Sequence, residues 1–277
     1  MTRKSPFKII VLGSKGMLGQ MVFNYFSKHY EVIRYDARYT SDSRKKYLDK
    51  LNELGQAIVI NCIGLIKQKS NVASDLYFCN SILPYDLAAK LLPNSILIQP
   101  STDCVYEGDR EGFYVHDWLP DSRDDYGRSK SLGERAVFGR ANCYLLRTSI
   151  VGPDSSDRAA GLLSWFLRQK RGAEINGFTD HYWNGITTLE WCKMVHSIVF
   201  NDSERRLSGQ VLQLGVSTKY SKYDVLTIFG REFRPDILVK PIVTGKKVNR
   251  CLAPEYLCSS FERQVRDLKE LGYVEAC

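Results

Sequence analysis

SILIQPSTDCVYEG (Ser95–Gly108) and, after a loop, DDYGRSKSLGE (Asp124–Glu134) hold the most informative residues of this chain. The apolar run Ile96–Ile98 is typical of a buried parallel strand, which ends at Pro100. In open α/β sheets the carboxyl edge of such a strand is where ligands bind. The sequence places three polar residues at that edge: Ser101, Thr102 and Asp103.

Tyr126 and Lys130 stand four residues apart, which on a helix puts them on one face with Cβ atoms about 5–6 Å apart. An ammonium beside a phenol favours the phenolate, so we expect the pKa of Tyr126 to fall from about 10 toward neutral and make it a usable proton donor. A hydroxyl of Thr102 or Ser101 would hold a substrate oxygen beside it. Such pairs are common on solvated helices, and Ser-Thr-Asp is also a good turn or N-cap sequence. The combination with a nucleotide-binding start is what favours a catalytic site.

That start lies at the N-terminus, where the apolar run Phe7–Leu12 is followed by a G-x-x-G-x-x-G turn and an amphipathic segment through Tyr30. A strand, a glycine-rich turn and a helix are typical of a dinucleotide-binding unit. The first glycine permits the tight turn, the second lets the backbone approach a pyrophosphate, and the third allows close helix–strand packing. The predicted cofactor-binding residues here are Gly13, Ser14, Lys15, Gly16, Met17, Leu18 and Gly19.

Residues 31–38 form the predicted second strand and place Asp36 where an acidic residue binds the adenosine ribose of NAD(H). Three cations, by contrast, suit the 2′-phosphate of NADP(H): Lys15, Arg34 and Arg38. We predict that NADP(H) is slightly preferred and that NAD(H) remains open. The third strand, residues 57–63, ends where a cofactor would cross the sheet, which adds Cys62, Ile63 and Gly64 to the site. Lys67 follows and faces either the substrate or the solvent.

The net charge, the cysteine pattern and the length of the apolar stretches exclude several classes of protein. The formal charge is +8, but no Lys/Arg run exceeds three and no basic stripe is interleaved with aromatics, so we expect no nucleic-acid partner and instead an anionic small ligand such as a nucleotide diphosphate. Eight cysteines without a C-x-x-C pair argue for free thiols in a reducing compartment and against a metal site. No apolar stretch approaches 18 residues and no signal-peptide core is present, so we expect a cytoplasmic protein without a membrane span.

Strands and helices alternate up to Gly152, with helices predicted over 39–54 and 76–92 and a further strand over 143–149. This pattern predicts an α/β fold, a Rossmann-type doubly wound parallel sheet. Beyond Gly152 the pattern changes, so we expect a smaller C-terminal substrate lobe. The predicted division gives residues 1–152 and about 187–214 to the NAD(P)-binding domain, and about 153–186 and 215–277 to the lobe. Asn80 interrupts the apolar face of its helix, either to satisfy a bend or as part of a proton path.

GSKGMLGQ, NCIG, STDCVY, DDYGRSKSLGE, LLRTSIVG and WNGITT together resemble the extended short-chain dehydrogenase/reductases, and within them the dTDP-4-dehydrorhamnose reductase group. The resemblance covers nearly the whole chain. It implies NAD(P)H-dependent reduction of the C4 keto group of a nucleotide-linked 4-keto-6-deoxy-sugar, in the biosynthesis of a deoxysugar for a polysaccharide. It implies that Tyr126 gives the proton, that Lys130 holds the nicotinamide ribose, and that Thr102 orients the carbonyl. The substrate-binding residues that follow are Lys67, Ser101, Thr102, Asp103, Cys104 and, by charge and position, Arg250.

The chain departs from that group in two places. Where the rhamnose reductases carry a Trp near the base, it has Ile150–Gly152, and where they have Gly-x-Pro-Thr, it reads Gly185–Thr188. The nucleotide, dTDP, UDP or GDP, therefore stays open. Cys104 matches the placement of an epimerisation acid/base in GDP-fucose synthases, with His181 as a substitute for the missing partner histidine, although an inert buried thiol is the favoured interpretation.

Some relatives keep this fold as a non-catalytic regulatory subunit, such as that of methionine adenosyltransferase. The joint presence of Thr102, Tyr126 and Lys130 favours an enzyme instead. Because relatives often pair through the helix that carries the Tyr, the resemblance also implies a homodimer as the alternative to a monomer.

Overall fold

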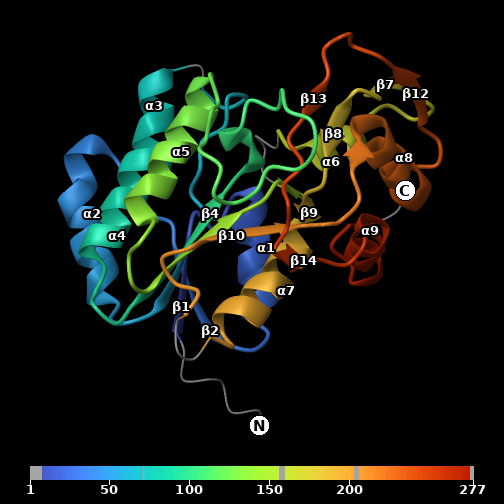
Figure 1. Ribbon diagram of the computed structural model, residues 1–277. Helices are drawn as coiled ribbons and strands as arrows, with labels where there is room; N and C mark the ends of the chain where they lie inside the picture. Colours follow the sequence, from blue (N-terminus) through green and yellow to red (C-terminus); the bar gives the residue numbers. More distant parts are fainter. Residues whose placement is uncertain (1–7, 71, 156–159, 203–205, 275–277) are drawn as a thin grey trace.

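A seven-stranded parallel sheet forms the centre of the molecule (Figure 1). The computed structural model describes residues 8–70, 72–155, 160–202 and 206–274. The strands lie in the order β14-β10-β5-β4-β3-β1-β2, and every neighbouring pair is parallel. Their bounds are β1 Lys8–Leu12, β2 Glu31–Tyr35, β3 Ile58–Asn61, β4 Ile96–Ser101, β5 Cys143–Arg147, β10 Val211–Gly215 and β14 Tyr256–Leu257. The chain adds β2 on one side of β1 and then crosses to β3 on the other, which creates a switch point where α/β folds bind ligands.

Both faces of the sheet are covered by helices, because its central strands are apolar on both sides. In β1, Ile9 and Val11 pack into one core with α1 (Met17–Phe26) and α7 (Thr188–Val199). Ile10 and Leu12 point into a second core on the opposite face. Its helices are α2 (Arg44–Glu53), α4 (Leu83–Lys90) and α5 (Asp125–Val137). The predicted doubly wound sheet is confirmed.

The helix predicted over 76–92 is not continuous. It divides into α3 (Ala73–Tyr77), a π-helical segment η2 (Phe78–Ile82) and α4. The side chain of Asn80 lies in the π-helical segment, and a bulge of this kind often marks a functional site. Two 3-10 turns complete this half of the chain, η1 (Ser41–Ser43) and η3 (Asp103–Val105).

Shorter elements gather beside the carboxyl edge of the sheet (Figure 1). β7 and β12 form a parallel pair, β11, β8 and β13 form a three-stranded sheet, and β6 pairs with β9. Their bounds, with those of the accompanying helices, are β6 Ile150–Val151, α6 Leu162–Leu167, β7 Glu174–Phe178, β8 His181–Trp183, β9 Ile186–Thr187, β11 Tyr220–Ser221, α8 Lys222–Phe233, β12 Leu238–Ile242, β13 Val248–Asn249 and α9 Phe261–Glu270. The division into two domains stays a prediction, and β14 from the predicted lobe is a strand of the main sheet.

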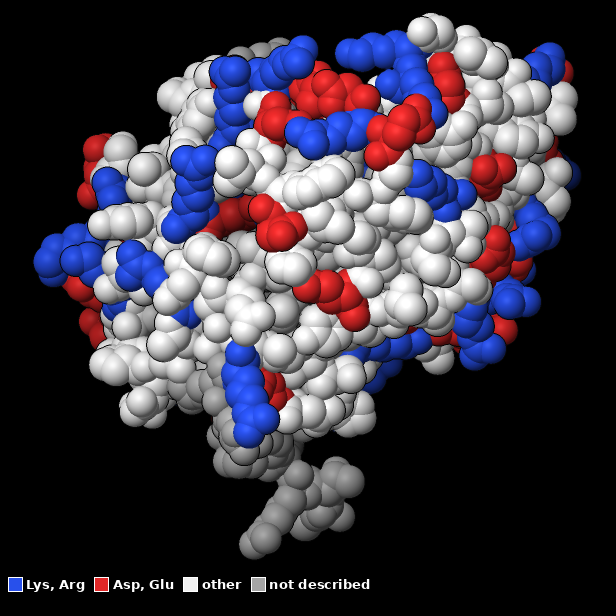
Figure 2. Space-filling model, in the orientation of Figure 1, with Lys and Arg blue, Asp and Glu red and all other residues white. Residues whose placement is uncertain are grey.

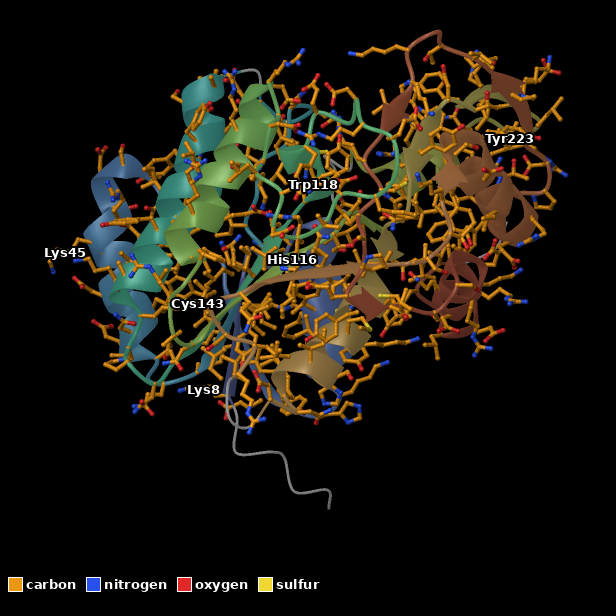
Figure 3. The ribbon with its side chains drawn as sticks, viewed as in Figure 1. Lys8, Lys45, His116, Trp118, Cys143 and Tyr223 are labelled. Carbon is orange, nitrogen blue, oxygen red and sulfur yellow. The ribbon has the colours of Figure 1, made fainter. Side chains whose placement is uncertain are left out.

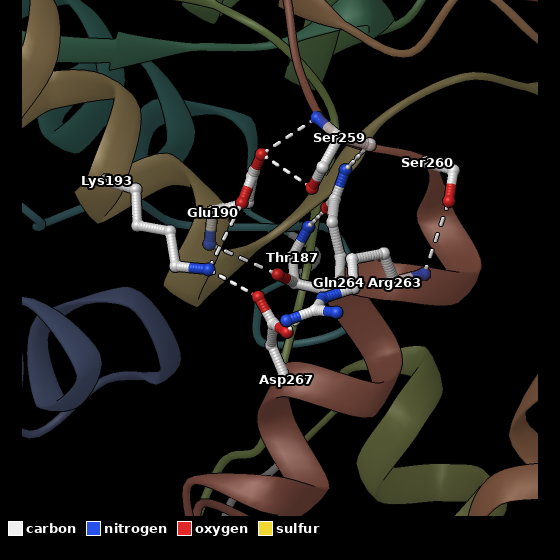
Figure 4. A network of polar contacts seen from close by, with 8 residues as sticks. All are labelled: Thr187, Glu190, Lys193, Ser259, Ser260, Arg263, Gln264 and Asp267. Atoms are coloured by element: carbon white, nitrogen blue, oxygen red, sulfur yellow. Dashed lines mark hydrogen bonds and ion pairs between the residues drawn. The ribbon is translucent and has the colours of Figure 1, made fainter.

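A polar network fastens α9 to α7 (Figure 4). The Glu190 carboxylate accepts hydrogen bonds from the backbone N–H and hydroxyl of Ser259, each at 2.9 Å. Gln264 accepts one from the backbone N–H of Thr187 at 2.8 Å, and Lys193 pairs with Asp267. Elements more than 60 residues apart in the chain are thereby joined.

Charges of both signs are interspersed on the face shown in Figure 2. Several surface cations are paired with carboxylates, including Lys247 with Glu111 at 2.7 Å. Within the described ranges, no helix is both long enough and apolar enough to cross a membrane, and no group of three or more metal-binding side chains occurs.

Candidate active site

A cavity of about 480 Å³ opens beside the carboxyl ends of β1, β3 and β4. The segments that follow these strands form much of its wall, together with α5 and one residue of the smaller sheets. Most of the predicted site residues line it: Gly16, Met17, Leu18, Cys62, Ile63, Gly64, Lys67, Ser101, Thr102, Asp103, Cys104, Tyr126, Lys130 and Arg250. Outside the lining lie Gly13, Ser14, Lys15, Gly19, Asp36 and Arg38.

The three glycines of the first turn differ in what they permit. Gly13 has a φ of 71°, a left-handed conformation that favours glycine. A Cβ atom on Gly19 would lie 2.2 Å from the Gly13 carbonyl oxygen, so the helix could not approach the strand so closely. A Cβ on Gly16 would meet only one protein atom, at 3.7 Å, and Gly16 lines the cavity. The open space above Gly16 and the uncapped start of α1 fit a dinucleotide diphosphate.

Asp36 follows β2 and is tied to this turn. Its Oδ1 accepts hydrogen bonds from the hydroxyl and the backbone N–H of Ser14, at 2.8 and 3.2 Å. Lys15 and Arg38 are exposed, while the guanidinium of Arg34 lies over the Phe23 ring at 3.6 Å from its centroid. Asp36 is therefore the charged residue of this group that contacts the glycine-rich turn directly.

Thr102, Tyr126 and Lys130 come together at the cavity wall. The Thr102 hydroxyl lies close enough to the Tyr126 phenol to favour its ionised form, and it donates to Asp103 Oδ1 at 3.0 Å. Lys130 donates to the carbonyl oxygen of Pro100 at 2.8 Å. A hydroxyl, a phenol and an ammonium thus share one wall of a cavity that also reaches the glycine-rich turn.

The expected lowering of the Tyr126 pKa is wrong. Tyr126 and Lys130 keep some accessible surface in the cavity, but the surrounding protein solvates their charged forms poorly. Burial, followed by the nearby Cys104, raises the pKa of Tyr126 well above its usual value, and the adjacent Thr102 hydroxyl only partly opposes this. Burial also lowers the pKa of Lys130 to about 8. The phenol is consequently fully protonated at neutral pH, the form that a proton donor needs.

The first turn of α5 is fixed by Asp124, a residue that the sequence analysis missed. Its Oδ1 accepts the Gly127 N–H at 2.8 Å as an N-cap, and its Oδ2 pairs with Lys67 at 2.8 Å. Burial opposes ionisation of Asp124, but the contacts with Lys67 and Gly127 outweigh it and hold its pKa below the usual range. An acid two residues before Tyr126 is a recognisable N-cap signal. Its pairing with Lys67 depends on the tertiary fold.

Ser101 lines the cavity, but its hydroxyl already has a partner within the protein, and its role in substrate binding stays a prediction. The hydroxyl donates to the buried carboxylate of Glu134 at 2.6 Å. Asn80 is similarly engaged: its amide accepts from the N–H of Leu65 and donates to the Leu65 carbonyl, both at 2.9 Å, and it also donates to Ser129 at 3.0 Å. Asn80 thus holds the loop after β3 in place and also lines the cavity, and its part in a proton path stays a prediction.

Asp103, Cys104 and Arg250 line the side of the cavity near Tyr126. Arg250 reaches back to the carbonyls of Tyr106 and Glu107, at 3.0 and 3.1 Å. Burial raises the pKa of the Cys104 thiol to about 12, so it is a weak acid here. His181 bonds Thr244 at 3.1 Å and is not part of the lining, so it does not serve as the partner suggested for Cys104.

Two curated proteins are related to this chain. A probable low-salt glycan biosynthesis reductase from Haloferax volcanii is 30% identical over 193 residues, which cover 61% of this chain and 63% of that protein. The match thus spans less than two thirds of that relative. Methionine adenosyltransferase 2 subunit beta from Xenopus tropicalis is 22% identical over 92% of this chain and 82% of its own length.

Solved structures share the fold. The dTDP-4-dehydrorhamnose reductase from Bacillus anthracis, in complex with NADP, superposes with a TM-score of 0.80 at 18% identity, over 94% of this chain and 97% of that one. A dTDP-4-dehydrorhamnose reductase from Clostridium acetobutylicum gives 0.78 at 20% identity, over 97% and 100%. The model of the RmlD substrate binding domain matches residues 7–259. The chain belongs to the RmlD substrate binding domain family.

Proposed function

We propose that this protein is an NAD(P)H-dependent reductase of the C4 keto group of a nucleotide-linked 4-keto-6-deoxy-sugar, working in deoxysugar or polysaccharide biosynthesis. One observation carries the proposal: Thr102, Tyr126 and Lys130 share the wall of a cavity that extends to Gly16 at the glycine-rich turn. The NADP complex of the Bacillus anthracis reductase and the glycan biosynthesis reductase of Haloferax volcanii support it.

In this proposal a nicotinamide cofactor, held by the turn around Gly16 and by Lys130, supplies the hydride. Tyr126, fully protonated at neutral pH, donates the proton to the sugar's carbonyl oxygen. Thr102, which lines the same wall beside the phenol, orients that oxygen. Among the cations that line the cavity, we assign Lys67, which also pairs with Asp124, and Arg250 to the sugar nucleotide's negative charge, with Asp103 and Cys104 on the sugar side.

The proposal is tested by following NADPH and NADH oxidation at 340 nm with dTDP-, UDP- and GDP-4-keto-6-deoxyhexoses. We expect turnover with one nucleotide series and a product reduced at C4. Running the reaction in D₂O separates simple reduction from the bifunctional epimerase alternative, because epimerisation at a carbon next to the carbonyl would exchange its proton for deuterium. Cofactor binding without turnover of any sugar would instead favour the regulatory-subunit alternative, which the methionine adenosyltransferase relative keeps open.

We propose that both nicotinamide cofactors bind and that Asp36 limits the affinity for NADPH. A carboxylate at the end of the second strand accepts a hydrogen bond from the adenosine ribose and repels a 2′-phosphate. The predicted preference for NADP(H) rests on three cations: Lys15 and Arg38 lie exposed, and Arg34 on β2 lies over the Phe23 ring.

Asp36→Asn is expected to raise the ratio of kcat/KM for NADPH over NADH about tenfold, equivalent to about 1.4 kcal/mol, because one negative charge near the 2′-phosphate is removed. Titrating the fluorescence of each reduced cofactor gives the same comparison without a sugar substrate. Asp42→Asn, which neutralises a nearby acid on η1, is the matched control. An unchanged ratio in Asp36→Asn would assign cofactor choice to other residues.

We further propose a homodimer formed through the outer faces of η2, α4 and α5, where four large apolar side chains are exposed: Ile82, Tyr85, Leu132 and Phe138. Leu132→Asp is expected to convert dimers to monomers in sedimentation velocity runs. A monomer at all concentrations of the unaltered protein would contradict the proposal.

A cytoplasmic location is proposed on the seven free thiols among the described cysteines, which a reducing compartment preserves.

A further inference from the structure

One face of α5 contacts the end of β4 and the residue that follows it at three successive turns of the helix. Tyr126, Lys130 and Glu134 are spaced by four residues and lie on that face. Tyr126 lies beside Thr102 in the cavity lining, and Lys130 donates to the Pro100 carbonyl. Glu134 accepts the hydroxyl of Ser101 at 2.6 Å. Each turn of the helix is thus matched to one of three consecutive residues of the chain.

Arg147 extends this contact to the next strand. It is the register partner of Ser101 on β5, and both bind the same Glu134 carboxylate. The Arg147 guanidinium forms a two-pronged pair, with Nε at 2.9 Å from Oε1 and Nη2 at 2.7 Å from Oε2. The two side chains are only 2% and 5% exposed. One carboxylate therefore joins the helix to two neighbouring strands.

The third guanidinium nitrogen of Arg147, Nη1, is also engaged. Nη1 donates to the Tyr106 hydroxyl at 2.7 Å, the Gln213 amide oxygen at 3.1 Å and the His116 carbonyl at 3.2 Å. His116 lies on the loop that passes between α5 and the smaller lobe (Figure 3). A buried ion pair adds little net stability compared with well-packed apolar residues, but its directional contacts can specify one arrangement.

Sliding or rotating α5 against β4 would leave the buried charges of this pair without partners, at a large cost. The same movement would carry Tyr126 and Lys130 away from Thr102. We propose that Glu134 is a positioning residue, which through Ser101 and Arg147 fixes where α5 presents Tyr126 and Lys130 to Thr102 at the end of β4. The inference rests on the proposed roles of Tyr126, Lys130 and Thr102.

Glu134 also acts on Lys130 through its charge. Burial lowers the pKa of Lys130, and the nearby Glu134 and Cys104 oppose that fall. Arg147 pairs with Glu134. The other titratable or charged groups that line this cavity are Cys62, Lys67, Lys69, Asp103, Asp124, Tyr126, Asp154 and Arg250. Removing the negative charge of Glu134 is therefore expected to move the Lys130 pKa further down.

Two variants test the proposal. Glu134→Gln keeps the shape of the side chain and an acceptor for Ser101 but removes the charge, and we expect kcat to fall about 10²-fold, as small misplacements of catalytic groups do. Ser101→Ala removes the link to β4 and leaves the ion pair intact, and we expect a smaller fall, about tenfold. Cofactor affinity should change less than kcat in both. If Glu134→Gln does not fold, the kcat of Ser101→Ala still tests the positioning role of Glu134.

Asp86→Asn is the matched control. Asp86 is another buried carboxylate held by two guanidinium contacts, from Arg44 at 2.8 and 2.9 Å, and it does not line the active-site cavity. We expect it to lower the melting temperature and leave kcat unchanged. Normal kcat in folded Glu134→Gln and Ser101→Ala would overturn the positioning role and leave Glu134 a purely structural residue.

A second readout needs no sugar substrate. Competitive acetylation followed by mass spectrometry gives the titration midpoint of Lys130, expected near pH 8 in the unaltered protein, lower in Glu134→Gln and unchanged in Asp86→Asn. A midpoint that does not move in Glu134→Gln would contradict the inference. Should the unaltered protein reduce no sugar nucleotide, the proposed function would fail while this measurement still judged the link between Glu134 and Lys130.

Discussion

Replacing Tyr126 by Phe is expected to lower turnover about 10²–10⁴-fold, the usual contribution of a positioned general acid, while cofactor affinity stays the same. The change removes one oxygen atom and keeps the ring that packs beside Thr102. Because burial holds the phenol in its protonated form, the hydroxyl is ready to donate at neutral pH, and Phe has nothing to replace it.

Steady-state kinetics and cofactor fluorescence, measured side by side, separate the two effects. Tyr77→Phe on α3 serves as the control, because it also removes a tyrosine hydroxyl. That hydroxyl donates to Asp125 at 3.3 Å, an exposed contact in the first turn of α5. Turnover of Tyr126→Phe within a fewfold of the unaltered protein would remove Tyr126 from the mechanism, whatever the control does.

Two glycine substitutions in the first turn are expected to have different effects, one on cofactor binding and the other on stability. Gly16→Ala should leave the melting temperature unchanged, because its methyl group meets no crowded protein atom, yet weaken cofactor binding at least about tenfold by occupying the diphosphate position. Gly19→Ala forces a methyl group to within 2.2 Å of the Gly13 oxygen and should destabilise the protein by about 1–3 kcal/mol.

Calorimetry and cofactor titration on both variants check this contrast, and each glycine controls for the other. Full cofactor affinity in Gly16→Ala would show that the ligand does not approach this turn. An unchanged melting temperature in Gly19→Ala would mean that α1 moves away from the strand at little cost.

The sequence predicted the parallel sheet, the glycine-rich turn and the shared wall of Thr102, Tyr126 and Lys130, because each depends on local spacing and on the direction of a strand. It did not predict the partner of Ser101, since a hydroxyl at a strand end looks the same whether it faces a ligand or a carboxylate 33 residues later in the chain. It also did not predict the direction of the Tyr126 pKa, because i, i+4 spacing carries no information about burial.

For Asn80 the sequence predicted that partners are needed but not which residues they are. The sequence marked it as a polar residue on an apolar face, and an amide there needs partners. Its two main contacts are with the backbone of Leu65, which any residue would provide, so the sequence could not name them.

The position of β14 has a consequence for how the chain folds during synthesis. This strand extends the edge of the central sheet beside β10, and the chain that follows it supplies the partners of two residues of α7: Ser259, just before α9, for Glu190, and Asp267 on α9 for Lys193. Both are made after the other six strands of the central sheet. Synthesis proceeds at about 5–20 residues per second. Until β14 is made, β10 is therefore the open edge of the sheet, a surface prone to pairing with other chains. A premature stop after residue 250 would leave that edge exposed, so we expect the shortened product to aggregate or be degraded rather than persist as a partly active enzyme.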